Sequence, residues 1–121
     1  MHIKRLVVAG AFAVTAATAA SAQAHAKLEA SEPQAAAVLD KTPKQVVLKF
    51  NEPLEAAISK IKLTDASNAE LPLPPAKIDA VGANTMSVPT PSLRAGEYHV
   101  QWSTVTRDGH KAKGDFAFRV K

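Results

Sequence analysis

Short segments of alternating apolar and polar residues, separated by turn-forming residues, run through this 121-residue sequence. Alternation with period two places every second side chain on one face of a strand, whereas a helix needs apolar residues three and four apart. The eight prolines lie in the connections, where a missing N–H does least harm. The segments with this pattern are Lys27 to Ser31, Gln45 to Phe50, Ile58 to Thr64, Thr85 to Val88, Glu97 to Thr106 and Asp115 to Val120. They predict an all-β fold, an antiparallel β-sandwich of about seven short strands.

The first 24 residues have the organisation of a secretory signal peptide. Lys4 and Arg5 are followed by an apolar run from Leu6 to Val14, and small residues then lead to Ala24. The apolar run is shorter than the roughly 20 residues that span a bilayer. Cleavage after Ala22 or after Ala24 satisfies the small-x-small rule. We expect cleavage after Ala24, which gives a periplasmic protein that begins with His25.

Charge and cysteine content limit the function of the mature chain, residues 25–121. The full sequence has a net charge of +4, and two of its basic residues lie in the signal peptide, which leaves +2. A charge this small, with no run of basic residues, gives no indication of nucleic-acid binding. The sequence has no cysteine, so neither disulfides nor thiolate metal ligands are available. We expect a single domain over residues 25–121 and a monomeric protein.

Three histidines remain in the mature chain: His25, His99 and His110. Asp108 and His110 are separated by one glycine, so their side chains lie on the same side of an extended backbone. By itself this pattern favours a polar hairpin tip over a metal site. A histidine at a free amino terminus adds an α-amine and a ring nitrogen, which together close a chelate ring on a metal. Three nitrogens and one oxygen suit Cu(II) better than Zn(II), which prefers a tetrahedral site.

Four motifs make the chain similar to the copper resistance protein C (CopC) family, and the similarity extends over almost the whole mature chain. These motifs are HAKLEASEP from His25, VLKFNEPL from Val47, LRAGEYHVQW from Leu93, and DGH from Asp108. The resemblance implies a seven-stranded Greek-key sandwich or barrel of cupredoxin-like or immunoglobulin-like shape. It also implies a periplasmic Cu(II)-binding protein, not an enzyme, that takes part in copper buffering, resistance or delivery to an inner-membrane copper transporter of the CopD type.

The family resemblance assigns the Cu(II) ligands to His25, Asp108 and His110. Glu52 in FNEPL matches a family glutamate near the copper, which either lies beside the copper without binding it or serves as a weak axial ligand. A surface charge at a strand end remains an open alternative for Glu52. Some family members carry a second, Cu(I) site on a methionine-rich loop, but the mature chain has only Met86, which we expect in the core. The chain therefore resembles a Cu(II)-only member.

Two rival functions remain open. A copper oxygenase of the lytic polysaccharide monooxygenase type uses a similar N-terminal histidine chelate, but it would need a flat, aromatic-rich substrate surface. This chain has one Trp and one Tyr. A metal-free envelope sandwich is the second rival, because this architecture hosts many functions. Trp102 is expected to be a core anchor, and His99 is expected to face solvent.

Overall fold

The two longest strands, β8 (Gly96–Val105) and β9 (Lys111–Val120), form an antiparallel hairpin that is paired from Gly96↔Val120 to Val105↔Lys111. A computed structural model describes residues 26–121 of the chain. The hairpin is the centre of a five-stranded sheet with strand order β2-β9-β8-β4-β5. The other strands of this sheet are β2 (Val38–Leu39), β4 (Lys60–Asp65) and β5 (Glu70–Leu71).

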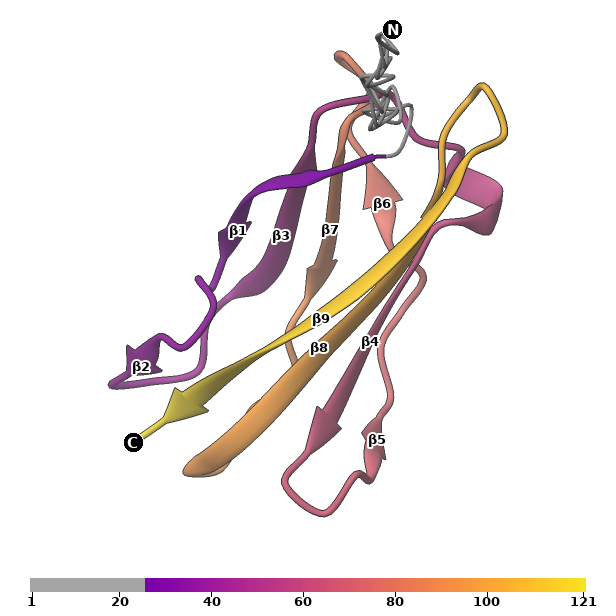
Figure 1. Cartoon of the computed structure of the whole chain (residues 1–121). Helices are drawn as coiled ribbons and strands as arrows, with labels where there is room; N and C mark the ends of the chain where they lie inside the picture. The colour runs from indigo at the N-terminus through magenta and orange to yellow at the C-terminus, as the bar shows by residue number, and fades with distance from the viewer. Residues whose placement is uncertain (1–25) are drawn as a thin grey trace, which may run out of the picture.

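The second sheet has four strands in the order β1-β3-β7-β6. It consists of β1 (Leu28–Glu32), β3 (Gln45–Phe50), β6 (Lys77–Ile78) and β7 (Thr85–Pro89). A short 3₁₀ helix, η1 (Ala56–Ile58), lies between β3 and β4, where the chain passes from one sheet to the other. Figure 1 shows the two sheets as separate layers, with β8 and β9 in front of β3 and β7.

The core lies between the sheets and is built from the alternating residues of each strand. In β3 the pattern is strict, because Val46, Leu48 and Phe50 are fully buried while Gln45 and Lys49 are exposed. Tyr98 and Phe118 stack with ring centroids 5.7 Å apart, and the Tyr98 hydroxyl donates to the Arg94 carbonyl at 2.8 Å. The other buried apolar residues are Ala26, Leu54, Ile61, Leu63, Ala83, Met86, Val88, Val100 and Val120.

The predicted all-β sandwich is confirmed, and each of the six predicted segments overlaps a strand. The structure adds three two-residue strands, β2, β5 and β6, which give the sheets short edges. β9 begins at Lys111, four residues earlier than expected, because the hairpin continues to Val105. β2 pairs parallel with β9, which differs from the expected antiparallel arrangement. β5 ends before Pro72, because proline has no N–H for a ladder bond.

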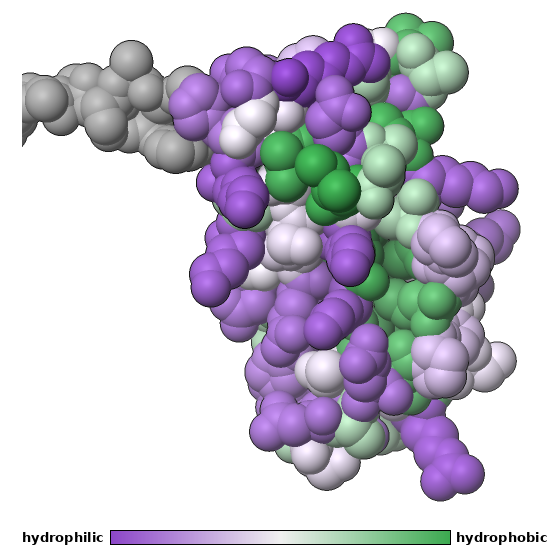
Figure 2. Space-filling view, turned by 90° about the vertical axis from the view of Figure 1, so that its right-hand side faces the viewer, coloured by the Kyte–Doolittle hydropathy of each residue, from purple (hydrophilic) through white to green (hydrophobic). Residues whose placement is uncertain are grey.

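The β8–β9 loop, η1 and the beginning of β1 lie at one end of the sandwich, opposite β2 and the C-terminus (Figure 1). The side of the molecule shown in Figure 2 is mostly hydrophilic, but hydrophobic residues gather in its upper half and in a line below. Within residues 26–121 no helix is long or apolar enough to cross a membrane.

Candidate metal site

The loop between β8 and β9 brings Asp108 and His110 together. Asp108 Oδ2 lies 3.0 Å from His110 Nδ1, and both side chains remain about half exposed. Gly109 between them has φ +91°, a conformation that side chains with a Cβ rarely adopt, so glycine allows this tight turn. The backbone closes the loop, since Thr106 N donates to the His110 carbonyl and Gly109 N donates to the Thr106 carbonyl, both at 2.9 Å.

Thr106 holds both members of this pair and was not identified from the sequence. It is 2% exposed, and its hydroxyl donates a hydrogen bond to Asp108 Oδ1. The Thr106 hydroxyl oxygen also accepts a hydrogen bond from the His110 backbone N–H at 3.1 Å. Hydrogen bonds to the Asp108 carboxylate, first from the Thr106 hydroxyl and then from the His110 side chain, lower the pKa of Asp108 to about 2 from an ordinary value of 3.8. Asp108 is therefore an ionised, oriented carboxylate at neutral pH.

The FNEPL segment ties this loop to the beginning of the described chain. On one side, Asn51 Oδ1 accepts the Lys27 N–H at 2.7 Å, and Asn51 N donates to the Lys27 carbonyl at 3.1 Å. On the other side, Leu54 forms an isolated bridge with Thr106, and Glu55 N donates to the Val105 carbonyl at 2.8 Å. Residues 51–55 thus connect the chain start to the loop that carries Asp108 and His110.

His25, the predicted N-terminal ligand, lies outside the described residues. Its neighbour Ala26 is 5% exposed and belongs to the core cluster, so the chain is anchored directly after His25. The anchored position lies at the same end of the sandwich as the β8–β9 loop (Figure 1). Within residues 26–121 there is no group of three or more His, Cys, Asp or Glu side chains that could hold a metal.

Glu52 lies in the connecting segment between Asn51 and Leu54. Its side chain is half-buried, and its Oε2 atom is buried without a hydrogen-bond partner among the described residues. A buried carboxylate oxygen without a partner is costly. A buried carboxylate oxygen is not what the alternative of a plain surface charge at a strand end predicts.

The other three side chains singled out from the sequence are not part of this loop. Met86 is fully buried in the core, as expected. His99 is half-buried on β8, with Nε2 3.9 Å from Glu97 Oε1, and seven residues of strand, roughly 23 Å, separate it from Thr106. Trp102 is partly buried and packs edge-on against Phe50 at 4.9 Å, which agrees with its expected role as a core anchor.

The comparison with family models decides the classification, because the CopC domain model matches residues 28–121. The chain belongs to the CopC family. Protein YobA of Escherichia coli K12 is 37% identical over 102 residues, which cover 84% of this chain and 82% of that protein. Copper resistance protein C of Escherichia coli is 36% identical over 108 residues, covering 84% and 85%.

Two solved structures and one longer protein are also similar to this chain. The crystal structure of CopC from Methylosinus trichosporium OB3b superposes with a TM-score of 0.76 at 29% identity, covering 80% of this chain and 94% of that one. PcoC of Escherichia coli, described as a methionine-rich copper resistance protein, has a TM-score of 0.67 at 34% identity, covering 81% and 100%. The copper transport protein CutJ of Bacillus subtilis is 29% identical over 98 residues, 80% of this chain but only 18% of CutJ.

Proposed function

We propose that the mature protein binds Cu(II) in the periplasm through the α-amine and imidazole of His25, the carboxylate of Asp108 and the imidazole of His110. The observation that carries this proposal is the 3.0 Å separation between Asp108 Oδ2 and His110 Nδ1 on a loop held by buried Thr106. Neighbouring ligands with metal bonds of about 2.0–2.1 Å lie about 2.9 Å apart, so the pair suits one metal ion.

The donor atoms favour Cu(II) over Cu(I). A soft Cu(I) site needs several thioethers or thiolates. The chain has no cysteine, and Met86 is fully buried among core residues. PcoC, by contrast, is described as methionine rich. Nitrogen and oxygen donors suit Cu(II), which also has the highest affinity of the common divalent metals.

Tight Cu(II) binding without catalysis fits copper buffering, resistance or delivery. The relatives named copper resistance protein C support this role, and CutJ is a copper transport protein of which the matching region is a minor part. We therefore propose that the protein passes copper to an inner-membrane transporter of the CopD type. Glu52 is proposed to lie beside the copper, where its buried oxygen either accepts a hydrogen bond from a ligand or binds weakly along the axis.

A Cu(II) titration with a competing chelator tests the site. The mature chain that begins with His25 is compared with its His110→Ala variant, and His99→Ala is the matched control because His99 lies on the same strand pair away from the loop. We expect His110→Ala to lose most of the affinity and His99→Ala to bind like the wild type. Equal affinities of wild type and His110→Ala would remove the proposed site.

A further inference from the structure

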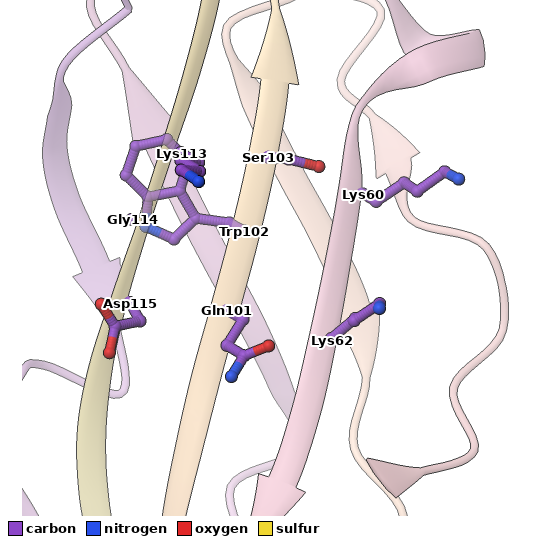
Figure 3. A pocket seen from close by; sticks show the side chains of 8 residues that line it. All are labelled: Lys60, Lys62, Gln101, Trp102, Ser103, Lys113, Gly114 and Asp115. Carbon is purple, nitrogen blue, oxygen red and sulfur yellow. The ribbon is translucent and has the colours of Figure 1, made fainter.

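The outer face of strands β4, β8 and β9 carries four exposed lysines. Lys60 and Lys113 flank Ser103 in the register of the sheet, and Lys62 lies one row below, beside Gln101. Lys111 lies two residues before Lys113 on β9, closer to the β8–β9 loop. Figure 3 shows Lys60 and Lys62 on one side of β8 and Lys113 on the other. We call this set of four lysines the lysine face.

The positive charge of the lysine face is not neutralised by the protein. None of its four lysines forms an ion pair with another residue in the range 26–121. Lys60, Lys62 and Lys113 line a shallow hollow on this face, and Asp115 is the one acidic residue among the residues that line it. The lysine face together with Asp115 has a local charge of +3, whereas residues 26–121 as a whole have a net charge of only +2. Such concentration produces a field that attracts a negatively charged partner.

An apolar hollow adjoins the lysine face near the candidate metal site. It has a volume of about 660 Å³ and is lined by Ile58, Val105 and Ala112 together with Lys111 and Lys113. Ile58 is 51% exposed, although burial of such a side chain would be favourable by about 1.5–3 kcal/mol. Val105 directly precedes Thr106. The hollow shares Ser103 and Lys113 with the hollow in Figure 3, so the two form one surface.

We infer that this surface docks a protein partner that presents an apolar side chain flanked by carboxylates. The apolar side chain would enter the hollow beside Ile58, and the carboxylates would pair with Lys111 and Lys113. The concave, apolar floor favours a protruding protein segment over a flat bilayer, which would meet the lysines but leave the hollow unfilled. A partner bound here lies next to the loop that carries Asp108 and His110. The inference itself does not depend on copper binding.

The test uses the mature, metal-free protein and a defined probe. The probe is an acetylated peptide with two leucines at its centre and glutamates on both sides, titrated into ¹⁵N-labelled protein at low salt. We expect the amide signals of Val105, Ala112 and their neighbours to shift. The double variant Lys111→Glu/Lys113→Glu should weaken binding by about tenfold or more. High salt should weaken binding to the wild type as well, because exposed pairs are screened.

A second double variant with the same change in net charge shows whether binding depends on the lysine face or only on the charge of the whole protein. Lys49→Glu/Lys77→Glu makes the same change on strands β3 and β6 of the other sheet, and it should bind the peptide almost like the wild type. Equal weakening by both double variants, absence of saturable binding, or shifts confined to the other sheet would overturn the inference. Binding to phosphatidylglycerol vesicles through Lys111 and Lys113, with no binding of the peptide, would assign the face to membranes and would also overturn it.

Discussion

Thr106, almost fully buried at the end of β8, donates its hydroxyl hydrogen to the carboxylate of Asp108 two residues later. The hydroxyl oxygen of Thr106 in turn accepts a hydrogen bond from the backbone N–H of His110. One side chain therefore orients the carboxylate and fixes the backbone of the histidine. Hydrogen bonds among the loop's own residues thus hold the two predicted copper ligands in place.

The first prediction concerns this hydroxyl. Thr106→Val keeps the shape of the side chain but removes both hydrogen bonds, so we expect a loss of about 1.5–3 kcal/mol in the free energy of unfolding, measured with urea. The pKa of Asp108, followed by NMR, should rise from about 2 toward 3.8. Thr106→Ser should restore both quantities in large part. A Thr106→Val variant with an unchanged Asp108 pKa would contradict the role of this hydroxyl.

The second prediction concerns the contact between Gly114 and Trp102. These residues are partners across β8 and β9, and a Cβ at position 114 would lie 2.5 Å from Trp102 Cζ2 and 2.8 Å from Cε2. Gly114→Ala should therefore destabilise the protein by about 1–3 kcal/mol in thermal or urea unfolding. In a Trp102→Phe background, which lacks the benzo ring that carries Cζ2, the same substitution should cost less. Equal costs in the two backgrounds would show that the indole is not the cause.

The third prediction concerns pH. The folded pKa of Asp108 is lowered to about 2, so its stabilising contribution is present above the ordinary value of 3.8 and is lost as the pH falls toward 2. Amine and imidazole donors must lose their protons to bind a metal, and in model peptides these groups have pKa values of about 7.7–8.0 and about 6.5. Copper affinity, measured by chelator competition, should therefore decrease as the pH is lowered from about 8 to about 5.

Asp108→Asn is the control for this pH dependence. This variant should bind Cu(II) more weakly than the wild type, but with the same dependence on pH between about 5 and 8. A wild-type midpoint near pH 4 that disappears in Asp108→Asn would contradict the assignment of the pH dependence to the nitrogen ligands.

The longer strands were predictable because apolar and polar residues alternate along them, most regularly in β3 with Val46, Leu48 and Phe50. The Asp108–Gly109–His110 loop was also visible in the sequence, since both polar groups flank a glycine. Thr106 was not, because a threonine at a strand end gives no sign of whether its hydroxyl faces solvent or a neighbouring carboxylate. The link from Lys27 through Asn51 to Thr106 was equally hidden, because its residues are far apart in the sequence.

The lysine face depends on the sheet register, which a strand pattern alone does not give. Lys60 and Lys113 are separated by more than fifty residues, and only the pairing of each with Ser103 brings them to one row. The short strands β2, β5 and β6 were missed because two residues cannot show a period.

The most direct test of the central claim compares two amino termini on the same mature chain. A protein that begins with His25 has a free α-amine on the histidine, whereas one that begins with Gln23 has that nitrogen in a peptide bond. Mutation of a residue that hydrogen-bonds to a metal ligand already lowers metal affinity about 10–100-fold. Loss of a ligand itself should therefore lower it at least about a hundredfold. We predict that Cu(II) affinity, measured by chelator competition, falls by this much in the chain that begins with Gln23. Equal affinity of the two proteins would contradict a site built on the amino terminus of His25.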